Sequence, residues 1–537
     1  MDVAWPHHWR VLSAFDPLPS GPGRATTEVV VAMCALGLLR VAAGLRRRKR
    51  TAWVIAVAAC VLIAVVDLVR VENRPVEGVL TIILLAILLL ARGEFQARPD
   101  PHNRRVAIRR GSTLSAVALG YGFVLINLSG HVPGSPTPLA RAREVLLSFV
   151  GLGGTLRMAD GDFADAFHAS LLAMGLLTAA STAVLLLRTS EPLPHLSRAD
   201  EERLRDLLAR SGERDSLGYF ALRRDKSVIW SPSGKAAITY RVVAGVALVS
   251  GDPIGDPEAW PGAIEAYRQL VARYGWTQAV MGCSELGATV IRRELGLCVL
   301  GLGDEAVLAT TCFSLEGRAM RAVRQPHARV ARAGYVASAR RVREIGPAEL
   351  AELRAAADAW RTDRVERGFS MALSRLGDPA DGDCLVVTAR QDGELRGLLH
   401  FAPWSRRKVS LDLMRRDPSS DNGLNEFMIA ELMSAAPGLG IDEVSLNFAV
   451  FREALERGSR VGAGPISRLW RRFLLVASRW WQIDSLYRFN GKFHPEWRPR
   501  YFCYSSARDV PRIACAAMEA ESFIAWPAFL RHLVGRP

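Results

Sequence analysis

Long apolar segments in the first 190 residues limit most strictly what this 537-residue chain can fold into. A helix needs roughly 20 apolar residues to cross a bilayer. Five segments have about that length, at 27–45, 51–69, 76–91, 111–128 and 164–187. The first contains Arg40 and fits least well. The sequence therefore predicts a membrane domain of about five helices over residues 1–190.

Basic residues gather in alternate loops of this region. The motif "RRRKR" follows the first segment, six arginines lie between the third and fourth, and Arg188 follows the fifth. Loops rich in lysine and arginine stay on the cytoplasmic side. With five spans these three loops share one side; four spans, without the first segment, also leave the remaining chain inside. We therefore predict a multi-pass protein of the plasma membrane whose part after residue 190 is cytoplasmic.

The net charge and the spacing of the cysteines indicate which kinds of ligand and partner this chain could bind. The formal net charge is +15, and only five of the 69 basic residues are lysine. A basic chain favours an anionic partner such as nucleic acid or anionic lipid, and guanidinium groups pair well with phosphate. A basic membrane protein without such a partner is the alternative. The eight cysteines form no CxxC pair and no zinc spacing with histidine, so we expect free thiols, no metal and no cofactor.

Ionisable residues are scarce within the apolar segments. Asp67 lies near the end of one segment and His168 near the start of another. Only deeply buried charges argue for a proton path across a membrane. No buried acid–base pair is obvious in these segments, and we expect both residues at the interface rather than on a proton path.

After residue 190 the pattern changes to short strands alternating with helices. Residues 191–210 read as a proline-containing linker followed by an amphipathic helix. The expected strands are 227–230, 236–251, 277–283, 384–390, 395–404, 408–415 and 442–451, and the expected helices are 257–274, 315–332, 348–361, 424–435 and 513–534. This repeated cadence predicts two related α+β halves, over residues 200–340 and 341–537. A single large mixed domain is the alternative.

Two motifs of this part could bind an anion. In "SGDPIGD" a strand ends in a tight turn around Asp252, which could hold an anion or be an ordinary turn with a helix cap. In "FSLEGRAMRAVRQPHARVARAGY", Arg318, Arg321 and Arg324 are three residues apart and would share a helix face. That face predicts contact with a phosphate backbone; a solvated helix face is the alternative.

The stretch "KVSLDLMRRDPSSDNGLNEFMIAEL" places charged residues where a strand ends. Strand alternation predicts that Asp412 and Met414 lie on one face, with Arg415 at the strand end, where pockets open in such folds. The following turn delivers Asn425 and Glu426 at a helix start. A carboxylate can bind an ammonium group and a guanidinium can bind phosphate or carboxylate. A salt-bridge cluster that caps the turn is the alternative.

Aromatic and basic residues interleave between 464 and 504. Apolar residues that include Trp480 follow helical spacing with arginines mostly opposite, which predicts a helix on an anionic bilayer surface; a core helix is the alternative. Lys492, Arg498 and Arg500 follow, among aromatic residues. Such a pattern suits a single-stranded nucleic-acid end or a lipid head group.

Five motifs together resemble the catalytic module of lysyl-phosphatidylglycerol synthases, the multiple peptide resistance factor family. They are "GDPIGD", "FSLEGRAMRAVRQ", "LDLMRRDPSSDNGLNEFMI", "SLNFAVFR" and "LYRFNGKFHPEWRPRYFCY". The resemblance covers about residues 200–525 and is closest to the form fused to a lysyl-tRNA synthetase. It implies tandem acetyltransferase-like (GNAT) domains behind the membrane helices. It also implies transfer of an amino acid, lysine by the family name, from aminoacyl-tRNA to phosphatidylglycerol, which lowers membrane charge and gives resistance to cationic antimicrobial peptides.

The resemblance also implies roles for single residues. Asp412 would hold an ammonium of the amino acid, Arg415 would orient the ester or a phosphate, and Glu426 is a candidate general base beside substrate-assisted deprotonation. The substrate-binding candidates are Asp252, Asn425, Asn447, Lys492, Arg498 and Arg500, with Lys492 and Arg500 directed to phosphates of the tRNA end or the head group. The expected partners are aminoacyl-tRNA, phosphatidylglycerol, the membrane and a second copy of the chain.

Some features depart from the family or leave other functions open. Many synthases carry Gly-x-Met-Asp where this chain has Gly423-Leu424-Asn425-Glu426, and no synthetase domain follows residue 537, so charged tRNA is expected from elsewhere. An acyl-CoA or peptide-bridge transferase is one alternative, although "RQDGELRG" reads as a hairpin turn rather than a pyrophosphate loop. A non-catalytic membrane regulator with a degenerate transferase fold is the other.

Overall fold

The computed structural model divides into two compact units, the first ending at Ser190 and the second beginning at Glu191. We describe each unit by itself. The structure describes residues 37–39, 41–46, 48–69, 75–95, 97, 101–130, 132–134, 136–151, 156–187, 191–361, 368–450 and 483–524.

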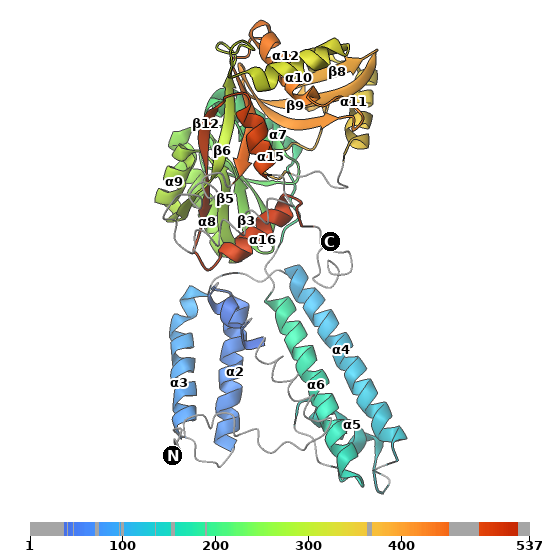
Figure 1. The fold of residues 1–537 in the computed structure, drawn as a ribbon. Helices are drawn as coiled ribbons and strands as arrows, with labels where there is room; N and C mark the ends of the chain where they lie inside the picture. The colour runs from blue at the N-terminus through green and yellow to red at the C-terminus, as the bar shows by residue number, and fades with distance from the viewer. Residues whose placement is uncertain are drawn as a thin grey trace, which may run out of the picture. The chain divides into compact units, whose positions relative to one another are not determined.

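Helices make up the described part of the first unit (Figure 1). They are α2 (Arg50–Val69), α3 (Pro75–Leu90), α4 (Pro101–Leu128), α5 (Pro138–Phe149) and α6 (Gly161–Leu186). By length and composition, two of the described helices can cross a membrane, over Arg105–Leu128 and Gly161–Leu186. Four of the five predicted segments coincide with α2, α3, α4 and α6. The first, 27–45, lies mostly outside the described residues.

Helix α5 was not expected, because residues 129–163 read as a loop. Thr137 caps its first turn by accepting a hydrogen bond from the Ala140 amide. The helix brings Glu144, whose side chain is fully buried, against α6, where His168 Nε2 lies 2.9 Å from Glu144 Oε1. Glu144 Oε2 also accepts from the Leu156 amide. This pair was not visible in the apolar segments, because the partner of His168 comes from a helix that the sequence did not predict.

One twelve-stranded sheet runs through the second unit, in the order β1-β2-β3-β5-β12-β6-β11-β10-β9-β8-β7, with β4 paired to β2. The strands are β1 (Ser227–Trp230), β2 (Ala236–Val243), β3 (Val246–Ser250), β4 (Ile254–Gly255), β5 (Thr277–Cys283), β6 (Cys298–Ala309), β7 (Tyr335–Arg341), β8 (Leu385–Gln391), β9 (Glu394–Ser405), β10 (Lys408–Arg416), β11 (Glu443–Val450) and β12 (Glu496–Tyr504). The helices are α7 (Arg198–Ser211), α8 (Trp260–Tyr274), α9 (Glu285–Leu295), α10 (Arg321–Arg332), α11 (Pro347–Ala359), α12 (Leu424–Ala435), α15 (Ile483–Gly491) and α16 (Val510–Ala520).

The same order of elements occurs twice along the sheet. Strands β1, β2 and β3 are antiparallel, and α8 then connects β3 to the parallel strand β5. Strands β8, β9 and β10 are likewise antiparallel, and α12 connects β10 to the parallel strand β11. The prediction of two related halves stays a prediction, and this repeated order supports it.

The last strand of each series pairs with the other series. Strand β6, which follows the first series, lies beside β11, and β12, which follows the second, lies beside β5. The two exchanged strands are neighbours at the centre of the sheet. The exchange makes one continuous sheet out of both series, so the core of neither series is complete without a strand from the other.

Four strands, the two-residue β4 and the longer β6, β7 and β12, were not predicted from the sequence, and one predicted strand is two strands in the structure. Strand β12 carries Pro499 in the middle of a sheet, where proline is rare because it cannot donate to the ladder. Strand β6 contains two glycines and two acids, and β7 is an edge strand. The expected strand 236–251 is split by a hairpin turn at Ala244 and Gly245, both with positive φ. The expected hairpin in "RQDGELRG" is confirmed between β8 and β9.

Helix α12 is the centre of a hydrophobic core. Its buried side chains Leu424, Phe427, Met428 and Leu432 pack on one face of strands β8, β9 and β10, as the apolar pattern predicted. Helix α10 lies beside α12 (Figure 1), and begins at Arg321 rather than near residue 315. A second core, on the other face of these strands, includes residues of α7 and α11. A third core packs α16 against β3 and β5.

The close approach of α10 and α12 generates a first prediction. Gly423, at the start of α12, has a φ of 98°, and a Cβ there would lie 2.5 Å from Pro326 Cβ. Gly423→Ala should therefore cost about 2 kcal/mol or more of stability, because a strained φ and a clash add. Gly317 also has positive φ but has open space around it, so Gly317→Ala should cost only about 1 kcal/mol.

The measurement is the apparent melting temperature of the detergent-solubilised full chain. Equal losses for both variants would contradict the close packing of α10 on α12.

Candidate functional site

The parallel strands β10 and β11 separate beyond their first residues. They pair only between Lys408–Ser410 and Glu443–Ser445, although they continue to Arg416 and Val450. The corresponding strands β3 and β5 of the first series stay paired over Val246–Ser250 and Thr277–Met281. Of these two parallel pairs, only β10 and β11 therefore diverge, and we call this divergence the fork.

A bulge in each strand produces the fork. On β10, Leu411 and Leu413 face consecutive residues of β9, so Asp412 is an extra residue. On β11, the register against β6 shifts between Ser445 and Phe448. Asn447 within that bulge has a φ of 70°, and its Nδ2 donates to the Leu411 carbonyl over 2.9 Å. A side chain thus bridges the strands where backbone pairing stops, and the bulges re-aim the side chains around it.

The bulge overturns one expectation. Met414 faces Leu399 and packs on the α12 side of the sheet, whereas Asp412 contacts His400 on the opposite face. The prediction that Asp412 and Met414 share a face was wrong, because the inserted residue reverses the alternation after Asp412. Arg415 faces Leu398 and therefore lies on the same face as His400 and Asp412.

Asp412 is held from two directions. Its Oδ2 lies 2.6 Å from His400 Nδ1, and its Oδ1 accepts from the Leu373 amide over 2.7 Å. The His400 side chain is fully buried and that of Asp412 is 5% exposed. Burial by itself would lower the pKa of His400, but the adjacent Cys384 and Asp412 outweigh it and raise that pKa to about 10. His400 is therefore an imidazolium at neutral pH.

Cys384, His400 and Asp412 do not form a nucleophilic triad. The Cys384 thiol is fully buried, and burial raises its pKa. A nucleophilic cysteine needs a lowered pKa and access to substrate. His400 thus pairs with Asp412 and does not activate the Cys384 thiol as a nucleophile.

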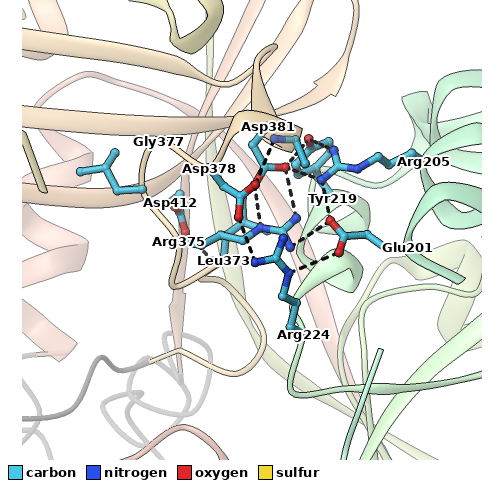
Figure 2. Close-up of polar contacts among 12 residues, drawn as sticks. Glu201, Arg205, Tyr219, Arg224, Leu373, Arg375, Gly377, Asp378, Asp381 and Asp412 are labelled. Carbon is cyan, nitrogen blue, oxygen red and sulfur yellow. Dashed lines mark hydrogen bonds and ion pairs between the residues drawn. The ribbon is translucent and has the colours of Figure 1, made fainter. Parts of the chain in front are cut away.

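Asp412 connects the fork to the segment that runs from Gly368 to Asp381. Glu521 accepts from the Phe369 and Ser370 amides at one end of this segment, and Asp412 accepts from Leu373 in its middle. At the other end, acids and arginines interleave (Figure 2). The ion pairs link Arg205, Arg224 and Arg375 with Glu201, Asp378 and Asp381.

This network ties the segment to α7. Arg375 contacts Glu201 and Asp381 together, and Arg205 joins the same two acids. Asp381 is fully buried, so it depends on these partners. Because of the arginines, the pKa values of Glu201 and Asp381 lie below their usual range despite burial.

Arg415 differs from the other charged residues of the fork. It is half-buried, and its guanidinium makes no hydrogen bond or ion pair to any residue that the structure describes. An unpaired guanidinium beside a paired carboxylate is suited to an anionic or ester-bearing ligand.

Glu426 and Lys492 form a second pair at the start of α12. Lys492 Nζ lies 2.8 Å from Glu426 Oε1, and the lysine side chain is 38% exposed. Beside them in sequence, Asn425 Oδ1 and both amide atoms of Asn490 are buried without a hydrogen-bond partner in the described part of the chain. Unsatisfied buried groups of this kind cost roughly 1–3 kcal/mol each and concentrate at functional sites.

His400 and Asn490 were missed by the sequence analysis. Asn490 stands within the motif "YRFNGKFHP", whose charged and aromatic residues drew attention instead. His400 lies in an apolar strand, twelve residues before Asp412, with no local signal of the pairing.

Other predicted site residues lie elsewhere. Arg498 pairs with Glu443 and Glu496 at the beginning of β11, away from the fork. Arg500 is buried, and its guanidinium donates five hydrogen bonds. Asp252 is also buried and accepts two hydrogen bonds from Ser284. Neither Arg500 nor Asp252 offers an open face to a ligand.

The arginines around α10 divide into two kinds. Arg324 donates to the carbonyls of Leu315 and Gly317, both over 2.8 Å. Arg318 and Arg321 are exposed, and their side chains have no hydrogen bond or ion pair within the described residues. The predicted surface helix with Trp480 lies outside the described residues. Among those described, no group of three or more His, Cys, Asp or Glu could hold a metal ion.

Solved structures show which fold the second unit has. The second unit resembles the C-terminal domain of a protein described as a lysylphosphatidylglycerol synthetase from Agrobacterium fabrum, with 24% identity, a TM-score of 0.50, and coverage of 60% of this chain and 96% of that one. It also resembles L-PGS from Bacillus licheniformis, with 19% identity, a TM-score of 0.50, and coverage of 62% and 99%. The chain thus combines a membrane region with a mixed α+β, GNAT-like fold.

Family models specify this class further. Residues 205–504 match "Phosphatidylglycerol lysyltransferase, C-terminal", and residues 27–187 match "Transmembrane region of lysyl-tRNA synthetase". The chain is 45% identical over 514 residues to the lysylphosphatidylglycerol biosynthesis bifunctional protein LysX of Rhodococcus opacus, covering 93% of this chain and 45% of that protein. The chain therefore belongs to the phosphatidylglycerol lysyltransferase family, and spans about half the length of the curated relatives it matches.

The His400–Asp412 pair predicts a pH dependence of stability. The pKa of His400 is raised from 6.5 to about 10, so the stabilisation is fully present below pH 6.5 and is lost as pH rises through 10. The melting temperature of the wild-type chain should fall between pH 7 and pH 10 more steeply than that of His400→Gln. His195, an exposed histidine, provides the control variant His195→Gln. Equal slopes for wild type and His400→Gln would contradict the charged pair.

Proposed function

We propose that this chain transfers an amino acid, lysine by its family, from aminoacyl-tRNA to phosphatidylglycerol at the cytoplasmic face of the membrane. The observation that carries the proposal is Arg415, whose guanidinium has no partner among the described residues and which lies on the same face of the sheet as the charged His400–Asp412 pair. Membership of the phosphatidylglycerol lysyltransferase family supports the reaction. Its product carries less negative charge, which would give resistance to cationic antimicrobial peptides.

Different side chains of the fork bind different chemical groups of the two substrates. Arg415 binds a phosphate or the ester carbonyl, because its guanidinium has no partner within the described chain. Asp412 presents its remaining lone pairs to an ammonium group of the amino acid, since a carboxylate can accept about four hydrogen bonds and the described residues use two of them. Lys492 and Glu426 lie at the start of α12 as a further charged pair for substrate.

The reaction exchanges one ester for another. The glycerol hydroxyl attacks the aminoacyl carbonyl, the bond to the tRNA 3′ ribose oxygen breaks, and the proton of the hydroxyl passes to that oxygen. Because the donor ester is already activated, positioning accounts for much of the rate. Glu426 is our candidate base, with the substrate amine as the alternative proton carrier.

Placement at the membrane follows from sequence and family. The basic loops of the first unit favour an arrangement in which the part after residue 190 faces the cytoplasm, where charged tRNA is found. The exposed Arg318 and Arg321 are proposed contacts for the tRNA backbone, next to Arg324, which instead holds the preceding loop. We also propose that the chain associates with a second copy of itself.

Lipid composition tests the reaction. Cells that contain phosphatidylglycerol and express the wild-type chain should accumulate aminoacylated phosphatidylglycerol, measured by mass spectrometry of lipid extracts. Asp412→Ala and Arg415→Ala should lower it at least about tenfold, a loss of roughly 1.4 kcal/mol or more of transition-state binding. Arg407→Ala, which removes an exposed pair with Asp442, is the matched control and should leave it unchanged.

Two outcomes would count against the proposal. If membranes hold wild-type chain but no aminoacylated phosphatidylglycerol, the chain is a regulator or acts on another acceptor. If purified chain uses acyl-CoA in place of charged tRNA, the alternative GNAT reaction is correct.

Salt dependence of tRNA binding tests the arginines. Each phosphate contact to a single strand contributes roughly 0.7 to the slope of log K against log salt. Arg318→Ala/Arg321→Ala should reduce the slope by about 1 to 1.5 and weaken binding, measured by filter binding of labelled tRNA. Arg292→Ala, an exposed arginine on α9, should leave both unchanged. An unaltered slope in the double variant would exclude contact at these positions.

A further inference from the structure

Arg500 lies at the centre of the sheet, on the exchanged strand β12. Its side chain is 5% exposed. Nε and Nη2 donate to Glu305 Oε2 over 3.0 and 2.6 Å, and Nη1 donates to Asp215 Oδ1 over 2.7 Å. Nη1 also donates to the Gly282 carbonyl, and Nη2 donates to Ser216 Oγ. A guanidinium has five N–H donors, so these five bonds leave none for a phosphate.

Carboxylates outnumber cationic groups among the described residues around Arg500. Glu305 and Asp215 are buried, and the Asp215 carboxylate also accepts from the Asp252 amide. Burial and the nearby Asp215 raise the pKa of Asp252 to about 7, against the attraction of Arg500. The guanidinium is thus the cation that keeps these carboxylates together at the junction of the two series of strands.

Two short routes lead from Arg500 to the base of the fork. Along one, Ser445 Oγ donates to the free oxygen of Glu305 over 2.5 Å and accepts from the Asn447 amide over 3.1 Å. Along the other, the carbonyl of Ser216, whose hydroxyl accepts from Arg500, accepts from Ser410 Oγ over 2.8 Å.

These two serines are where the fork begins. Ser410 and Ser445 are the last paired residues of β10 and β11. The positive φ of Asn447, the next bulged residue, is unfavourable by itself and needs surrounding contacts to persist. Arg500 therefore lies one residue away from both strands at the point where they part.

We propose that Arg500 is a positioning residue: through Glu305–Ser445 and through Ser216–Ser410, it sets the opening of the fork and touches no substrate. This inference rests on the proposed transfer function. It assigns Arg500 a role different from the phosphate contact expected from sequence. It also explains why β12 is exchanged between the two series, because the exchange brings an arginine of one end of the chain beneath the site.

The test separates positioning from substrate binding by steady-state kinetics of the purified full chain with lysyl-tRNA and phosphatidylglycerol vesicles. Arg500→Lys should lower kcat at least tenfold while the KM for tRNA and the salt dependence of tRNA binding stay within about twofold of wild type. A lysine keeps the charge but cannot make the forked bonds. A raised KM with a smaller salt slope would instead show phosphate contact and overturn the proposal.

A milder variant keeps the test decisive if Arg500→Lys does not fold. Ser445→Ala removes the hydroxyl between Glu305 and Asn447 without altering any charge and should lower kcat several-fold at unchanged KM. Ser445→Thr keeps a hydroxyl and should restore most of the rate. The matched control is Ser231→Ala, a buried serine at the far side of the sheet, which should retain wild-type kcat.

Failure of this inference is distinguishable from failure of the proposed function. If Ser445→Ala has wild-type kcat while Asp412→Ala is inactive, the transfer reaction stands and the positioning role is wrong. If the wild-type chain transfers nothing to phosphatidylglycerol, the function fails first and the positioning role falls with it.

Discussion

The pairing of β10 with β11 stops after three residues, and the candidate site depends on that stop. Two parallel strands joined through a helix normally continue side by side, as β3 and β5 do. Here a bulge at Asp412 and another at Asn447 turn the strands apart, and the Asn447 side chain takes over the bridging hydrogen bond. The same bulges direct Asp412 and Arg415 to the face opposite α12. A carboxylate and a guanidinium thus share one face of the sheet, although simple alternation predicted another arrangement.

Burying the Asp412 carboxylate costs free energy, and hydrogen-bonding and charged partners from distant parts of the chain offset that cost. Asp412 is neutralised by a buried imidazolium on the neighbouring strand. The segment that donates to Asp412 is held by Glu521 at one end and by the network of Arg375 and Asp381 at the other. That network includes Glu201 of α7, the first helix of the second unit. The result is a site whose acidic residue is coupled to the N-terminal and C-terminal ends of the unit.

Much of the fold could be predicted from the sequence, whereas the hydrogen bonds and ion pairs of the site could not. The strands around the fork and helix α12 have strong apolar patterns, and charges at a strand end marked Asp412 and Arg415. Strand β12 was missed because its proline and arginines resemble a binding loop, and α5 was missed because its polar face is short. Arg500 seemed a ligand for phosphate because sequence shows charge but not burial. The Glu426–Lys492 pair joins residues 66 positions apart, a separation that no local pattern reports.

The sequence by itself determined the membrane region, the alternation of strands and helices, and the family, because hydrophobic periodicity and short motifs are local properties of the chain. Only the tertiary structure decided which of the charged residues face a ligand. Arg415, Arg498 and Arg500 look alike in sequence, yet the first has no partner among the described residues, the second pairs with Glu443, and the third is buried among carboxylates. The physical reason is that the state of a guanidinium depends on the acids and the water around it, and strand exchange and bulges decide which these are.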